Sequence, residues 1–325
     1  MLRLMNIKPI LIVAGEPKSV FFEIFFKSLK AKEYKKPLIL IGSEKLLKIE
    51  MKKFKFKKKI NVLNYENIKN YKLNNRSINI LNVNYNKKKS LTNKILSSKS
   101  YIQKSFEIAF RIIETGITDK LINGPISKKR FLNGKFPGIT EFIAKRFHKE
   151  KIAMLIYNKN LSVCPVTTHL PLKNVTKKIN KKEIKEKVFL LDNFYKSRFG
   201  YRPKIAILGL NPHCESFEKF NEEDKILKPV ISNLKKLKFK VTGPYAADTI
   251  FLKKNRDKFN VILGMYHDQV LTPIKTLFEY DAINITIGLP FTRISPDHGP
   301  NEKMLGKNTS NPLSLIRAIS FLDKN

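Results

Sequence analysis

Three of the five histidines in this 325-residue chain share one local context. His169 closes the run SVCPVTTH, His213 closes KIAILGLNPH, and His267 closes VILGMYH. Each histidine follows an apolar stretch typical of a buried β-strand and opens a polar turn. In an open α/β sheet, ligands bind beyond the carboxyl ends of the strands. We therefore expect the three imidazoles at one sheet edge, where they can converge on one metal ion.

Three neutral nitrogen ligands leave coordination positions open for water or substrate, which is typical of a catalytic metal site. Imidazole favours a borderline divalent ion such as Zn²⁺, Co²⁺ or Mn²⁺, and the sequence leaves Mg²⁺ open. Each histidine taken alone has a plainer interpretation, a half-buried ring satisfied by neighbouring polar groups. The metal site is favoured because three histidines share the same position at the end of an apolar run. His148, within KRFHKE, is expected on the surface.

Further polar residues follow the same apolar runs. Lys275 and Asn284 come after VILGMYH, and Arg293 lies in PFTRISPDHG. A lysine, an asparagine and an arginine suit a phosphate group, which binds charge-assisted donors. The turn Asn123-Gly124-Pro125 and the run GITE at 138–141 resemble a helix N-terminus that attracts an anion. The alternative is an ordinary threonine N-cap.

Three residues at these turns are candidates for proton transfer. Asp248 lies in AADT, Asp268 follows His267 directly, and His298 lies in PDHG. Carboxylates and imidazoles are the usual general acids and bases, and the sequence does not separate the three.

Several common motifs are missing. No two glycines are separated by a single residue, so the chain has no GxGxxG dinucleotide fingerprint. A phosphate loop, a GxSxG elbow and an HExxH zinc motif are also absent. A dinucleotide would therefore bind in a non-Rossmann arrangement.

The elements that must position these residues alternate between strand and helix. Amphipathic periodicity predicts helices over Ser19–Lys30 and Thr92–Thr115, the second ending at Gly116. This alternation predicts a mostly parallel sheet covered by helices on both faces. The predicted strands are Pro9–Ala14, Pro37–Gly42, Ile78–Val83, Lys120–Asn123, Leu161–Thr168, Lys204–Gly209, Val261–Met265 and Ala282–Ile287.

Composition narrows the class of protein. The chain is 42% hydrophobic and lacks a run of about 18 apolar residues, so we expect a folded protein without a membrane span. The first residues favour a strand over a signal peptide. Only Cys164 and Cys214 are present, which favours a reducing cytoplasm over a disulfide framework.

The net charge of +37 raises a nucleic-acid-binding alternative. Of the 64 basic residues only 10 are arginine. Arginine is the residue that grips phosphate and guanine with a planar fork, so a nucleic-acid reader should hold more of it. A drift of surface positions towards lysine is the favoured interpretation, and no specific nucleic-acid partner is expected.

Five segments together resemble the 4-hydroxythreonine-4-phosphate dehydrogenase family of vitamin B6 biosynthesis. They are VTTHLPLKNV, LGLNPHCES, GPYAADTIF, MYHDQVLTPIK and NITIGLPFTRISPDHG, in family order and spacing. The resemblance implies two α/β/α domains related to isocitrate and isopropylmalate dehydrogenases, with the active site in the inter-domain cleft. We expect one domain over 1–126 plus 303–325, and a second over 127–302 that carries the metal ligands and a homodimer interface.

The resemblance also implies an activity and roles. The family oxidises 4-phosphooxy-L-threonine with NAD⁺ to 2-amino-3-oxo-4-phosphooxybutanoate, which loses CO₂ to give 3-amino-2-oxopropyl phosphate. One divalent ion per subunit (zinc, magnesium or cobalt) is implied at the interface between subunits. By position, the metal ligands are His169, His213 and His267, and the substrate contacts are Thr140, Lys275, Asn284 and Arg293.

The chain departs from the family pattern at several positions. Ile139 stands where the family has a histidine that contacts the substrate, and Ser127 stands where another histidine is usual. The glycine-rich stretch near the N-terminus is replaced by GEPKSV, in which Lys18 offers a compensating contact. These departures leave a second possibility, a related dehydrogenase of a phosphorylated four-carbon sugar acid of the 4-phosphothreonate type.

Overall fold

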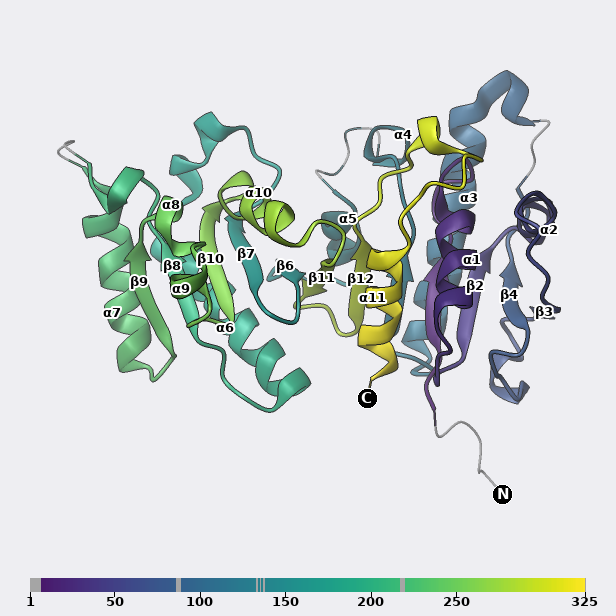
Figure 1. Ribbon diagram of the computed structural model, residues 1–325, viewed down its shortest axis with the longest axis horizontal. Helices are drawn as coiled ribbons and strands as arrows, with labels where there is room; N and C mark the ends of the chain where they lie inside the picture. Colours follow the sequence, from purple (N-terminus) through teal and green to yellow (C-terminus); the bar gives the residue numbers. More distant parts are fainter. Residues whose placement is uncertain are drawn as a thin grey trace. The chain divides into compact units, whose positions relative to one another are not determined.

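The computed structural model describes residues 7–85, 89–132, 134, 136, 138–216 and 220–324 (Figure 1). The chain forms two compact units, the first made of Met1–Phe142 with Pro290–Asn325 and the second of Ile143–Leu289. The sequence prediction put the first domain boundary after residue 126, earlier than in the structure, and the second after residue 302, later than in the structure. The second unit therefore contains less of the chain than expected, although all three candidate metal ligands fall within it.

In the described part of the first unit, six parallel strands lie in the order β3-β4-β2-β1-β5-β12. Strand β1 is buried along its whole length, because a strand covered on both faces is apolar throughout. The strands are β1 (Ile10–Val13), β2 (Leu38–Gly42), β3 (Ile60–Leu63), β4 (Ile78–Asn82), β5 (Lys120–Asn123) and β12 (Thr292–Pro296).

Two helices of the first unit, α1 (Phe21–Ala31) and α3 (Lys89–Glu114), match the two that the periodicity predicts. Helix α1 buries its phenylalanine-rich face and packs against α11 (Leu313–Asp323). Helix α3 contacts β1 and β2, and Gly116 follows it with φ of 76°, as expected for a C-terminal glycine. The remaining helices are α2 (Glu44–Lys53), α4 (Lys128–Leu132) and α5 (Ile139–Arg146), which runs across the boundary between the units.

The second unit holds strands in the order β11-β6-β7-β10-β8-β9. Strand β6 is antiparallel to both β11 and β7, whereas β7, β10, β8 and β9 run parallel. The prediction of a mostly parallel α/β fold is therefore confirmed. The strands are β6 (Ala153–Tyr157), β7 (Ser162–Thr167), β8 (Ile205–Leu208), β9 (Val241–Tyr245), β10 (Val261–Tyr266) and β11 (Ile283–Ile287).

Helix α6 (Lys181–Phe199) of the second unit has clear start and stop signals. The Asn180 side chain accepts from the backbone N–H of Glu183, and Gly200 ends the helix in the left-handed conformation. Helix α10 (His267–Phe278) buries Val270 and Ile274 in the core formed with β7, β8 and β10. The others are α7 (Lys228–Lys236), α8 (Ala247–Ile250) and α9 (Lys253–Arg256). Among the residues that the structure describes, no helix has the length and apolar character needed to cross a bilayer.

Candidate active site

The three candidate metal ligands follow three neighbouring parallel strands of the second unit. His169 comes just after β7, His267 begins α10 directly after β10, and His213 lies in the short turn Pro212–Cys214 after β8. Strand β10 pairs with β7 on one side and with β8 on the other (Figure 1). All three histidines thus lie at the carboxyl edge, where the sequence pattern puts them.

Two of the three imidazoles lie together. The ring centroids of His169 and His267 are 5.9 Å apart, a spacing that an ion between the rings can bridge. The side chain of His213 is 76% exposed, and its Nδ1 lies 3.9 Å from Oδ2 of Asp248. Within the described part of the chain, no three His, Cys, Asp or Glu side chains are grouped closely enough to hold a metal. The structure therefore brings together His169 and His267 but not His213.

Two of these histidines have unusual backbone geometry. The φ angles of His169 and His213 are 52° and 54°, in the left-handed region that residues with a side chain rarely adopt. Such a conformation costs roughly 1–2 kcal/mol per residue. Strain of this kind is concentrated at functional sites, where the surroundings hold a side chain in one place. The observation supports a role for both turns in presenting an imidazole.

The donor chemistry suits a divalent ion. Nδ1 of His267 lies 2.7 Å from Oδ1 of Asp268, so the carboxylate fixes the ring and leaves Nε2 for a metal. A carboxylate behind a histidine is a common arrangement around metal ligands. Asp268 itself is 79% exposed at the start of α10. The pair His169 and His267, oriented by Asp268, therefore fits a metal with nitrogen ligands.

Two predicted substrate residues also lie in the second unit. Lys275 is half-buried in the last turn of α10, and burial lowers the pKa of its ammonium group below the usual value. Asn284 lies on β11, and its buried Oδ1 has no hydrogen-bond partner among the described residues. An unsatisfied buried amide oxygen in a native protein calls for an explanation, and a bound substrate group supplies one.

Arg293 and Thr140 meet in the first unit. Arg293 on β12 is only 2% exposed. Its Nε donates to Oδ1 of Asn123 at 2.8 Å, and its Nη1 donates to Oγ1 of Thr140 at 3.2 Å. Burial lowers the pKa of Arg293 to about 10, an effect that Glu141 opposes, so the guanidinium stays charged at neutral pH.

The surroundings of Ile139 and Asn123 in the structure were not predicted from the sequence. Ile139 begins α5 and is buried, so its side chain is part of the packed interior. Asn123 ends β5 and holds the Arg293 guanidinium, although the sequence marked it only as part of a turn. The pairing of β5 with β12, which sets Arg293 opposite Leu121, is the long-range feature that joins them.

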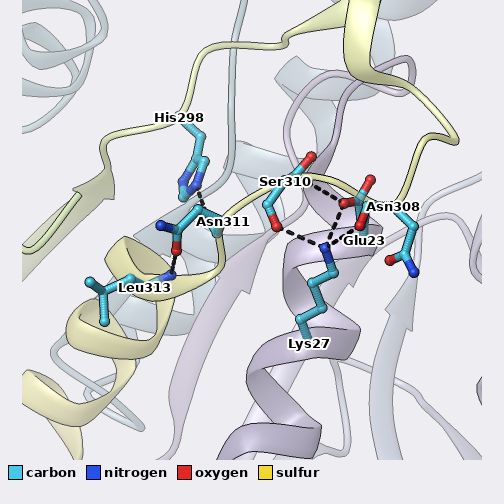
Figure 2. Close-up of polar contacts among 7 residues, drawn as sticks. All are labelled: Glu23, Lys27, His298, Asn308, Ser310, Asn311 and Leu313. Carbon is cyan, nitrogen blue, oxygen red and sulfur yellow. Dashed lines mark hydrogen bonds and ion pairs between the residues drawn. The ribbon is translucent and has the colours of Figure 1, made fainter. Parts of the chain in front are cut away.

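His298 lies in a long segment, residues 297–312, that we call the 297–312 loop. Its Nε2 lies 2.5 Å from the carbonyl oxygen of Asn311, so this nitrogen carries the proton and donates (Figure 2). The backbone N–H of Ser310 donates to Glu23, and Lys27 donates to the carbonyl oxygens of Asn308 and Ser310. His298 thus joins two parts of the 297–312 loop through its contact with Asn311. Its role in proton transfer stays a prediction.

A groove of about 630 Å³ lies in the second unit, lined mainly by residues of α8 and α10. Asp248 and Asp268 contribute its charged lining, and the rest is mostly apolar. The lining includes Ala247, Phe251, Leu252, Tyr266, Gln269, Thr272, Pro273, Thr276 and Leu277. Asp248 is 57% exposed here, which leaves its carboxylate accessible to a small molecule.

Comparisons with known proteins agree over most of the chain. Residues 33–322 match the profile of the family described as "Pyridoxal phosphate biosynthetic protein PdxA". The 4-hydroxythreonine-4-phosphate dehydrogenase of Sulfurihydrogenibium sp. (strain YO3AOP1) is 37% identical, over 95% of this chain and 96% of that protein.

Solved structures extend the likeness to the fold. A 4-hydroxythreonine-4-phosphate dehydrogenase from Klebsiella pneumoniae superposes with a TM-score of 0.82 and 26% identity, covering 97% of this chain and 98% of that one. A beta-decarboxylating dehydrogenase from Thermococcus kodakarensis has a TM-score of 0.51 at 12% identity, over 97% of this chain and 82% of that one. The second likeness concerns the fold alone.

Proposed function

Since the chain belongs to the family of the pyridoxal phosphate biosynthetic protein PdxA, we propose that its strand-end histidines hold the divalent ion used in its reaction. The chain is an oxidoreductase of pyridoxal phosphate biosynthesis, a 4-hydroxythreonine-4-phosphate dehydrogenase. The observation that supports the metal site most strongly is the pair His169 and His267, with ring centroids 5.9 Å apart at one strand edge.

In this proposal His169, His213 and His267 are the ligands of one ion per subunit, zinc, magnesium or cobalt. When bound, such an ion supplies Lewis acidity towards the C3 hydroxyl of the substrate and towards the carbonyl that replaces it. Because His213 lies apart from the other two, the proposal includes a homodimer in which a second subunit completes the ligand set. The exposed side chain of His213 and its strained turn support this arrangement.

The phosphate and the rest of the substrate are bound by Thr140, Lys275, Asn284 and Arg293 in this proposal. The guanidinium of Arg293 supplies a charged fork, and the Thr140 hydroxyl beside it supplies a further hydrogen bond. The buried Oδ1 of Asn284 accepts a hydrogen bond from a donor group on the substrate. Lys275 adds a second positive charge. Because its site is half-buried, its attraction for the phosphate is stronger than it would be in water.

Proton transfer falls to Asp248 in this proposal. Of the three candidates, Asp268 already orients His267, and His298 already binds the Asn311 carbonyl. Asp248 lies 3.9 Å from His213 with an exposed carboxylate, so it can accept the proton of the substrate hydroxyl. The same acid can then return a proton to carbon after CO₂ leaves.

A dehydrogenase of this family uses a nicotinamide cofactor, which accepts the hydride. We propose NAD⁺ over NADP⁺, bound without a GxGxxG loop because the chain has none. The cytoplasm is proposed as its compartment, since Cys164 and Cys214 are both free thiols.

One observation favours a second candidate substrate. Ile139 is buried and apolar where the family has a histidine that contacts the substrate. A dehydrogenase of a phosphorylated four-carbon sugar acid, of the 4-phosphothreonate type, would account for the loss of that contact. The deciding assay follows NADH formation with 4-hydroxythreonine 4-phosphate and with 4-phosphothreonate under identical conditions. We expect faster turnover of the first, and a preference for the second would replace the proposed substrate.

The lowered pKa of Lys275 predicts a pH dependence of substrate binding. Its cation is present below the pKa of the folded protein and is lost as the pH rises through that value. We therefore expect the KM for the phosphorylated substrate to rise with pH, starting below the ordinary lysine range. The measurement is the KM from pH 7 upwards for the wild type and for Lys275→Arg. The arginine variant should shift this rise to higher pH, and an identical profile would remove Lys275 from the phosphate site.

A further inference from the structure

One side chain links the two strand ends that carry His213 and His267. Gln269, in the first turn of α10, accepts a hydrogen bond at Oε1 from the backbone N–H of Met265 at 2.7 Å. Its Nε2 donates to the carbonyl oxygen of Gly209 at 2.8 Å. Met265 is near the end of β10 and Gly209 follows β8, so one amide fastens the ends of two paired strands.

A buried carboxylate holds the other side of the His213 turn. Glu223 is 0% exposed, and its Oε1 accepts from the backbone N–H groups of Leu210 and Asn211 at 2.7 and 2.9 Å. Its Oε2 accepts from Nδ2 of Asn211 at 2.8 Å. Burial opposes ionisation, but these donors outweigh it and lower the pKa of Glu223. The two residues that precede Pro212 and His213 are therefore fixed by an ionised group.

Gly209 lies between these two contacts and has no room for a side chain. A Cβ at Gly209 would lie 2.7 Å from Sγ of Cys214 and 3.1 Å from Oε1 of Glu223. Its backbone N–H also donates to the carbonyl oxygen of Tyr245 at 2.9 Å. The chain leading to His213 is thus held by β9, by Glu223 and by Gln269.

We propose that Gln269 and Glu223 are positioning residues for the metal site. Together they fix the His213 turn against the strand end that carries His267. The inference rests on the proposed metal site. The left-handed φ of His213 calls for support from its surroundings, and these hydrogen bonds hold residues 209–211, which come directly before Pro212 and His213. The fixed placement matters whether the ion is bound within one chain or shared between two subunits.

The chemistry of the amide explains why glutamine suits this place. The Met265 N–H needs an acceptor and the Gly209 carbonyl needs a donor, and an amide side chain supplies one of each. A glutamate of the same shape would accept from Met265 but would turn a negative oxygen towards the Gly209 carbonyl. Gln269→Glu therefore breaks the contact with Gly209, which links the His213 turn to the end of β10, while the volume of the side chain hardly changes.

The experiment measures Co²⁺ binding to the full-length protein by isothermal titration and by the visible absorption of the bound ion. We expect the dissociation constant of Gln269→Glu to rise at least about tenfold, as for other residues that orient metal ligands. The absorption bands should also shift, because the ligand geometry changes. Gln103→Glu, the same substitution at the exposed Gln103 of α3, is the matched control and should bind as the wild type does.

A second variant covers the case in which Gln269→Glu does not fold. Glu223→Gln keeps the shape but removes the charge that holds two backbone N–H groups, and it should weaken Co²⁺ binding in the same direction. A folded Gln269→Glu protein or Glu223→Gln protein with wild-type affinity and spectrum would overturn the inference while leaving the metal site intact. If the wild type itself bound no Co²⁺, both the metal site and the inference would be wrong.

Discussion

His267→Ala should abolish metal binding and lower kcat by about 10³-fold or more. Lewis-acid stabilisation by a bound ion is worth several kcal/mol, and each 1.4 kcal/mol is about tenfold in rate. Among the proposed ligands, the ring centroid of His267 lies 5.9 Å from that of His169, and its Nδ1 lies 2.7 Å from Oδ1 of Asp268. The measurement is NADH formation with 4-hydroxythreonine 4-phosphate, together with Co²⁺ titration of the same preparation.

The matched control for this variant is His148→Ala. His148 is exposed in the turn just after α5, away from the three strand ends, so its replacement should change neither metal binding nor kcat. The far-UV circular dichroism of His267→Ala should equal that of the wild type, because the ring lies at the edge of the sheet. Full activity in His267→Ala, resistant to EDTA, would be incompatible with a metal held by these histidines.

Arg293→Ala should raise the KM for the phosphorylated substrate by about 10- to 100-fold, with a smaller effect on kcat. A hydrogen bond to a charged group is worth about 1.5–3 kcal/mol, which corresponds to that range. The guanidinium is also held by Asn123 and Thr140, so its loss leaves both oxygens without their donor. Steady-state kinetics with varied substrate at saturating NAD⁺ give both constants.

Two further variants separate charge from geometry at this position. Arg293→Lys keeps the charge but loses the planar fork, so we expect a KM between those of the wild type and Arg293→Ala. Arg111→Ala removes an exposed arginine from α3 and should leave the KM unchanged. A wild-type KM in a folded Arg293→Ala protein would mean that this arginine holds β12 to its neighbours and does not bind phosphate.

Much of the fold is readable from hydrophobic pattern. Each of the eight predicted strands overlaps a strand of the structure, because most of these strands are buried and form continuous apolar runs. Strands β3 and β9 were missed: they lie at the two ends of the strand order, where one edge is unpaired and the pattern weakens. The missed β9 also contains Gly243 and Pro244, and the missed β12 contains the polar pair Thr292 and Arg293. The apolar β6 was missed too, and its sequence AMLIY is too short to distinguish strand from helix.

The site is readable only in part. Strand ends predict where a histidine lies along the sheet, and so His169, His213 and His267 all fall at one edge. Pattern cannot predict which side chains meet across the sheet. Asn123 meets Arg293 over 170 residues of sequence, and Gln269 meets Gly209 over 60. The contact of His298 with Asn311 depends on the path of a loop, which has no periodicity to read.

The charge of the chain does not by itself indicate its function. The net charge of +37 is carried mostly by lysines. In α2, for example, Leu47 is the only buried residue, and the basic side chains of the last turn lie on the outer side of the helix. A solvated helix face accounts for the lysines of this helix without a polyanionic partner.

Titration of the metal-depleted enzyme with a divalent ion tests most directly the claim that the strand-end histidines hold a catalytic metal. The protein is treated with EDTA, the chelator is removed, and Co²⁺ or Zn²⁺ is added in steps while NAD⁺ reduction by 4-hydroxythreonine 4-phosphate is recorded. We predict no turnover at the start and a linear rise that saturates at one ion per subunit. Full turnover in metal-free protein, or activity that never responds to added metal, would contradict a catalytic ion held by the strand-end histidines.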